Sequence, residues 1–210
     1  MQKITIFILR NMKKEILVFR HEDSSIQIPA GTIEEGESII ESAIREMYEE
    51  TGINRNEIEN IEELDTKLNE LLEHEVIIEK ESNIFSRSRE DSINWIKIRK
   101  GITVNKIREQ TGYSLIEYRE WNNEIEKDYF TYEICGWINS DNISHNKIRN
   151  FVVINVKTEK EIWNTFSDCH TFNHYFVNTK EIPKLLPNQE RWKTVLNKYL
   201  ENNHLTIAST

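Results

Sequence analysis

Short apolar runs rich in β-branched residues dominate the first thirty positions of the chain. The runs at 3–9 and 15–20 are separated by the polar residues 11–14, and this pattern predicts a β-hairpin. A polar loop follows, and then residues 26–29 predict a third short strand that leads directly to Gly31. The chain is therefore expected to begin with three strands that end at a glycine.

The apolar period changes from two to three or four residues shortly after this glycine. Apolar residues recur at the spacing of one helix face at Ile40, Ala43, Ile44 and Met47. Ser38 followed three residues later by Glu41 has the pattern of a capping box, and Gly52 suits a left-handed C-cap. These signals predict a helix over residues 39–51.

The opposite face of this predicted helix is polar and carries Arg45, Glu46, Glu49 and Glu50. Glu46 and Glu50 are like charges one turn apart, and such a pair destabilises an isolated helix by a few tenths of a kcal/mol. Three carboxylates on one face suit a hard divalent cation such as Mg²⁺, which takes oxygen ligands. The alternative is a solvated acidic face, which is common in a chain so rich in glutamate.

The spacing of the whole stretch is specific. From Gly31 to Ile53 it follows G-x5-E-x7-R-E-U-x-E-E-x-G-U, where U is an aliphatic residue, and every fixed position is filled. This pattern resembles the Nudix box, and multiplying residue frequencies gives a chance match on the order of 10⁻⁷. The resemblance implies an α/β (α+β) fold, an α/β/α sandwich with a mixed sheet. It also implies hydrolysis of a nucleoside diphosphate linked to another group, with Mg²⁺ or Mn²⁺ as cofactor.

The resemblance also implies roles for individual residues. It assigns the metal ligands to Glu46, Glu49 and Glu50, and the orienting pair to Arg45 and Glu37. It makes Gly31 the loop residue whose backbone lets the metal and the phosphates approach.

The sequence leaves two alternatives for the residue that deprotonates the attacking water. It is either a box glutamate, Glu49 or Glu46, or an acid on a loop outside the box. Outside the box, the candidate is Asp168, in the predicted loop before the last strand, with His170 as its substitute. The alternative for Asp168 is an ordinary turn aspartate that caps its own backbone.

The net charge, the cysteine content and the length of the apolar runs argue against several classes of protein. A formal net charge of -9 argues against general nucleic-acid binding, which is built from Lys and Arg, whereas a small nucleotide-diphosphate substrate held through a metal is compatible with it. The two cysteines, Cys135 and Cys169, suit a reducing cytoplasm, and no apolar run is long enough to span a membrane. We therefore expect a cytoplasmic protein without membrane partners. Its oligomeric state stays open, with a homodimer as one option.

The rest of the chain is expected to complete one Nudix domain over residues 1–210. Residues 54–75 show apolar positions at three- and four-residue spacing and predict a helix, and alternating runs between 95 and 139 predict strands. Together these segments predict a β-rich insertion at about 55–140. Strands at 149–157 and 172–177 and a helix at 187–200 are then expected to close the domain, with a frayed tail after residue 200.

Three functions are compatible with these residues. The first is a hydrolase of a nucleoside diphosphate linked to another group, and the second is a hydrolase of noncanonical nucleoside triphosphates. The third is a sensor that binds a nucleotide on a Nudix fold without cleaving it. Sensors that lose activity usually lose box glutamates, and this chain keeps all of them, so the two enzyme hypotheses are favoured.

Overall fold

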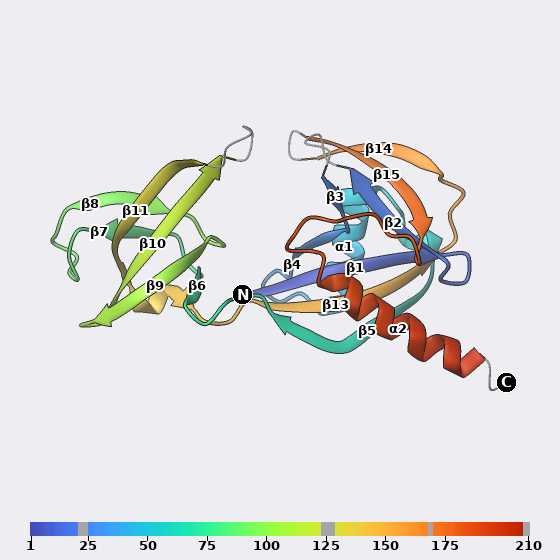
Figure 1. The fold of residues 1–210 in the computed structure, drawn as a ribbon, viewed down its shortest axis with the longest axis horizontal. Coiled ribbons are helices and arrows are strands. Elements are labelled where there is room, and N and C mark those ends of the chain that lie inside the picture. Colours follow the sequence, from blue (N-terminus) through green and yellow to red (C-terminus); the bar gives the residue numbers. More distant parts are fainter. Residues whose placement is uncertain (21–24, 123–128, 168–169, 208–210) are drawn as a thin grey trace. The chain divides into compact units, whose positions relative to one another are not determined.

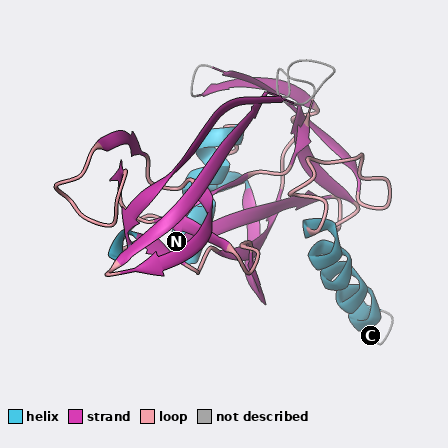
Figure 2. Ribbon diagram, turned by 60° about the vertical axis from the view of Figure 1, so that its left-hand side comes forward, coloured by secondary structure: helices cyan, strands magenta, loops and turns pink. Residues whose placement is uncertain are grey.

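The computed structural model describes residues 1–20, 25–122, 129–167 and 170–207. The chain divides into two compact units. The sandwich unit comprises Gln2–Leu68 and Arg149–Thr210, and the β-rich unit comprises Asn69–Ile148 together with Met1. Strands provide most of the regular structure, with the helices α1 and α2 among them (Figure 2). No helix in the described ranges is long and apolar enough to cross a membrane.

The sandwich unit is built on one mixed sheet in the order β14-β15-β2-β1-β13-β5, with β3 paired to β2 and β4 to β1. Its elements are β1 (Gln2–Arg10), β2 (Glu15–Arg20), β3 (Ile26–Gln27), β4 (Ala30–Thr32), α1 (Ile39–Thr51), a 3-10 turn (Arg55–Glu57), β5 (Ile58–Asn69), β13 (Ile148–Val156), β14 (Ile162–Ser167), β15 (His170–Asn178) and α2 (Trp192–Ile207). The predicted hairpin is confirmed by the antiparallel β1–β2 register, in which Leu9 faces Ile16.

Each face of the sheet carries a core, because successive side chains of a strand point to opposite faces. On one face, Ile4, Ile6 and Ile8 of β1 pack in the same buried cluster as Ala43 and Met47 of α1. On the other face, the intervening β1 residues pack with the buried side of α2 in a second cluster that includes Phe7, Leu9, Trp192, Leu196 and Tyr199. The sheet thus lies between the two helices (Figure 1), which confirms the predicted α/β/α sandwich.

The prediction of a helix at 54–75 is wrong, because most of this segment forms the strand β5. Ile61 packs against the core under α1, whereas Leu64 and Leu68 pack against the core under α2. A strand that contributes to cores on both sides of a sheet does not show a simple alternation of apolar and polar residues. The spacing of three between Ile58, Ile61 and Leu64 therefore imitated a helix.

Two boundaries near the C-terminus also differ from the prediction. The last helix begins at Trp192 rather than at 187, since residues 186–192 form successive turns, with Gln189 N donating to Leu186 O. The helix then continues to Ile207, through most of the predicted frayed tail.

The β-rich unit has a sheet and a core of its own. Its strands are β6 (Glu75–Ile78), β7 (Ser82–Phe85), β8 (Asn94–Ile98), β9 (Thr103–Gln110), β10 (Tyr113–Asn122), β11 (Tyr129–Asn139) and β12 (Ile143–Ser144), and a 3-10 turn (Ser140–Asn142) precedes β12. They pair in the order β12-β6-β9-β10-β11-β7-β8. The strands expected between 95 and 139 are confirmed by β8, β9, β10 and β11, whereas β6, β7 and β12 lie outside that range. The compact unit runs from 69 to 148, and the insertion was expected at about 55–140.

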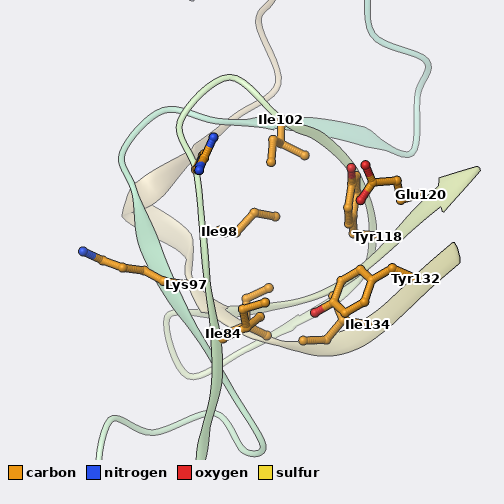
Figure 3. A pocket seen from close by; sticks show the side chains of 10 residues that line it. Ile84, Lys97, Ile98, Ile102, Tyr118, Glu120, Tyr132 and Ile134 are labelled. Carbon is orange, nitrogen blue, oxygen red and sulfur yellow. The ribbon is translucent and has the colours of Figure 1, made fainter.

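A cavity of about 250 Å³ opens on the core of the β-rich unit. Isoleucine side chains from several elements line it, and Tyr118 and Glu120 stand side by side at one wall, while Lys97 extends away from it (Figure 3). Lys97 forms an ion pair with Glu81 on the surface. The β-rich unit has a buried core of its own, which includes Val76, Ile78, Ile98 and Ile116.

Candidate functional site

Helix α1 has a defined start and a defined end. Ser38 is extended, its hydroxyl accepts a hydrogen bond from the backbone N–H of Glu41 at 3.2 Å, and the Glu41 carboxylate accepts one from the Ser38 N–H at 3.0 Å. At the other end, Gly52 adopts a left-handed conformation with φ of 65° and donates to Tyr48 O. Both predicted caps are confirmed, and they fix the helix at the residues that the sequence indicated.

The glutamates of α1 lie against β4, the short strand that contains Gly31. The Glu46 Oε1 atom accepts a hydrogen bond from Thr32 N at 3.0 Å, and Glu50 Oε2 accepts one from Ala30 N at 3.2 Å. A Cβ atom added at Gly31 would lie 1.9 Å from the Glu46 carboxyl carbon. A side chain at position 31 would therefore displace the Glu46 carboxylate, which occupies the space beside the Gly31 backbone.

Arg45 links the loop before α1 to the glutamates on the helix. Its Nε and Nη2 atoms donate to the two oxygens of Glu37, each at 2.9 Å, which is a bidentate pair. Its Nη1 atom donates to Glu49 Oε2 at 3.0 Å and lies 3.0 Å from Glu46 Oε1. The hydrogen bonds from Arg45 lower the pKa of Glu37 to about 2, and Glu37 is the main cause of the raised pKa of Arg45.

The acidic residues of α1 suit a hard divalent cation by their chemistry. Three carboxylates project from one turn of the helix beside a strand that has no side chain at Gly31, and the Glu49 side chain is 53% exposed. In the described residues, no group of three acidic, histidine or cysteine side chains is arranged to hold a metal. Arg45 contacts Glu46 and Glu49, and amides of β4 donate to Glu46 and Glu50. The donor set fits a metal, and binding one requires these side chains to exchange some of their present partners.

Of the candidates outside the box, Asp168 lies outside the described residues. His170 is an exposed residue at the start of β15. His174, four positions further along β15, is fully buried, and its Nε2 atom lies 2.8 Å from Thr165 Oγ1. The structure thus places the two described histidines of β15 in very different environments.

Sequence reasoning missed a group of residues that contacts the C-terminal end of α1. Lys160, Trp163 and Thr165 each donate a side-chain hydrogen bond to a backbone carbonyl in residues 50–52. They are more than one hundred positions away from α1 in the sequence, and no local spacing pattern marks them. Only the pairing of β14 with β15 and β2 brings them to the helix.

We predict that burial of His174 makes the protein less stable in mild acid. Desolvation by burial lowers the pKa of His174 from 6.5 to about 4, so the unfolded chain binds this proton more readily than the folded one. The contribution of His174 to the free energy of unfolding is fully present above pH 6.5. As the pH falls towards 4, the free energy of unfolding decreases by on the order of 3 kcal/mol. Urea denaturation from pH 8 to pH 4 measures this loss. The His174→Gln variant should show a shallower decline over that range, and an equally steep decline would contradict the assignment.

The geometry of α1 agrees with the sequence pattern of the box, because the helix is capped at both predicted ends and its glutamates and arginine lie beside the strand that contains Gly31. The family model of the NUDIX domain matches residues 2–99, a stretch that includes the whole box, so the resemblance of the box to the Nudix family is confirmed. The chain is also similar to the solved structure of the E. coli dihydroneopterin triphosphate pyrophosphohydrolase. The identity is 11%, the match covers 85% of this chain and 81% of that one, and the TM-score is 0.41. Comparison with curated protein sequences gives no match.

Proposed function

We propose that the chain is a Mg²⁺- or Mn²⁺-dependent hydrolase that cleaves the pyrophosphate bond of a nucleoside diphosphate linked to another group. The observation that carries this proposal is the folded geometry of the complete box. Its glycine lies under the Glu46 carboxylate, and its arginine binds Glu37, Glu46 and Glu49. Acidic residues that form only a solvated surface are not expected to share one arginine and to accept hydrogen bonds from the backbone of a neighbouring strand.

The box residues have separate roles in this proposal. Glu46, Glu49 and Glu50 hold the metal, which when bound neutralises phosphate charge and lowers the pKa of a water. Arg45 keeps Glu46 and Glu49 apart and oriented, and Glu37 in turn fixes the plane of the guanidinium. The lack of a side chain at Gly31 leaves room for the Glu46 carboxylate, so that this ligand and the metal that it would hold can lie close to the β4 backbone. We assign the proton-accepting role to Glu49 or Glu46, with Asp168 as the candidate outside the box.

The proposed location is the cytoplasm. Cys135 is a free cysteine in the β-rich unit; the residue is exposed, and partial desolvation together with the nearby charges of Glu117 and Glu133 raises the pKa of its thiol. A raised pKa keeps the thiol protonated at neutral pH, so Cys135 shows no sign of activation as a nucleophile. Its unpaired state suits a reducing compartment.

A substrate panel tests the proposal. The purified chain is incubated with Mg²⁺ or Mn²⁺ and with ADP-ribose, nucleotide sugars, dinucleoside polyphosphates, coenzyme A, NADH and modified nucleoside triphosphates. We expect turnover of a linked nucleoside diphosphate that stops when EDTA is added. Turnover confined to the triphosphates would favour the hydrolase of noncanonical nucleotides. Binding without turnover of any class would contradict the enzyme and favour the nucleotide sensor.

A further inference from the structure

The C-terminal end of α1 is held by side chains from the segment around β14. Three consecutive carbonyls of the chain, those of residues 50, 51 and 52, each accept one hydrogen bond from this segment. Thr165 Oγ1 donates to Glu50 O at 2.6 Å, Trp163 Nε1 donates to Thr51 O at 2.7 Å, and Lys160 Nζ donates to Gly52 O at 2.8 Å. The last carbonyls of a helix have no partners within the helix, so these donors satisfy groups that otherwise need water.

Apart from the Gly52 cap, the sequence of α1 offers no favourable charge at this end. The last turn of the helix contains no basic residue and carries two glutamates, Glu49 and Glu50, just before the final residue Thr51, at the negative end of the helix dipole. Lys160 supplies from outside the positive charge that this end lacks. The acidic end of α1 therefore depends on tertiary contacts for its position.

His174 holds two of these donors in place. The single hydroxyl hydrogen of Thr165 is directed to Glu50 O, so Thr165 Oγ1 must accept the hydrogen bond from His174 Nε2 at 2.8 Å. The hydrogen bond thus fixes the tautomer of His174 with its proton on Nε2. The indole of Trp163 stacks on the His174 ring, with centroids 5.1 Å apart and planes at 23°. In the antiparallel register, Trp163 and His174 are direct partners across β14 and β15.

Glu50 is consequently fixed at both ends. Its backbone carbonyl is held by Thr165, and its carboxylate accepts a hydrogen bond from Ala30 N of β4. Thr165 and β4 lie in different parts of the sheet, so the last turn of α1 cannot move towards or away from Gly31 without breaking one of these contacts.

We propose that Trp163, Thr165 and His174 are positioning residues that set the metal-binding geometry of Glu49 and Glu50 through the last turn of α1. This inference rests on the proposed function, because it takes those glutamates as metal ligands. The residues act through the backbone of the helix and do not touch the metal or the substrate. Loss of a partner that orients metal ligands typically weakens metal binding by roughly 10–100-fold.

The test measures Mn²⁺ binding to the full chain without substrate, by the electron paramagnetic resonance signal of free Mn²⁺. Thr165→Val removes the hydroxyl with little change of shape, and Thr165→Ser restores it. We expect Thr165→Val to weaken Mn²⁺ binding by about 10-fold and Thr165→Ser to bind close to the parent chain. Trp163→Phe, which removes the indole N–H but keeps a ring over His174, should also weaken binding, and it serves as a second test if Thr165→Val does not fold.

Asn164→Ala is the matched control. Asn164 lies between the two positioning residues on β14, but its side chain is exposed and accepts a hydrogen bond from Asn173 of β15. We expect this variant to bind Mn²⁺ like the parent chain. A melting temperature that falls in Thr165→Val with unchanged Mn²⁺ affinity would show a purely structural contact and overturn the proposal.

The two proposals fail in different ways. A parent chain that binds Mn²⁺ but hydrolyses nothing in the substrate panel contradicts the proposed reaction, and the positioning role is still decided by the binding of the variants. A parent chain that binds no Mn²⁺ overturns the positioning role together with the metal ligands on which it rests.

Discussion

Replacing Glu46, Glu49 or Glu50 by glutamine is expected to lower the rate of pyrophosphate hydrolysis by orders of magnitude. Each change keeps the size of the side chain and removes one negative charge from the proposed metal site, so phosphate charge in the transition state is left less compensated. The measurement is kcat and kcat/KM over a series of Mg²⁺ concentrations. The folded structure should survive, because the amide oxygen of glutamine can still accept the hydrogen bonds from β4.

Glu35→Gln provides the control for this series. Glu35 is exposed in the loop between Gly31 and the start of α1, so the control removes the same charge close to the site. We expect it to keep the parent rate. Parental activity in all three α1 variants would remove these glutamates from the reaction and return the acidic face to the role of a solvated surface.

Gly31→Ala is expected to disrupt the site almost as strongly as loss of a glutamate. The new methyl group would meet the Glu46 carboxylate at 1.9 Å, so Glu46 must move away from β4 and from its contact with Thr32 N. Overpacking of this kind typically costs about 1–3 kcal/mol of stability. We expect a lower melting temperature, weaker activation by Mg²⁺ and a fall in kcat.

A double-mutant cycle with Glu46→Ala tests the cause. When the Glu46 side chain is shortened, the methyl group at position 31 has room, so Gly31→Ala should cost much less stability in the Glu46→Ala background. An equal loss of stability in both backgrounds would show that Gly31 is needed for another reason than the approach of Glu46.

The parts of the molecule that could be predicted from the sequence are those with local causes. Helix α1 begins and ends where Ser38, Glu41 and Gly52 indicate, since caps act within a few residues of the helix end. The hairpin of β1 and β2 follows from two apolar runs separated by a short polar turn. The contacts of Arg45 with Glu37 and Glu49 connect positions eight and four residues apart, so the box spacing already contains them.

The parts that could not be predicted depend on distant segments. β5 was mistaken for a helix because its apolar residues contribute to two cores on opposite faces of the sheet. The hydrogen bonds of Trp163 and Thr165 to α1 join residues that are 112 and 115 positions apart in the sequence. No local sequence pattern around Trp163 or Thr165 predicts these contacts. The buried environment of His174 likewise arises only when β14, β15 and α1 come together.

The two ends of the β-rich unit meet at one point. Glu70 N donates to Lys147 O at 2.9 Å, and Lys147 N donates to the Asn69 side chain at 3.3 Å, so the chain leaves and re-enters the sandwich sheet between the neighbouring strands β5 and β13. A unit whose ends are joined in this way behaves topologically like an enlarged turn between two strands. A change in its length can therefore be accommodated without altering the pairing of β5 with β13, because both ends of the unit stay at the same place beside the sandwich sheet.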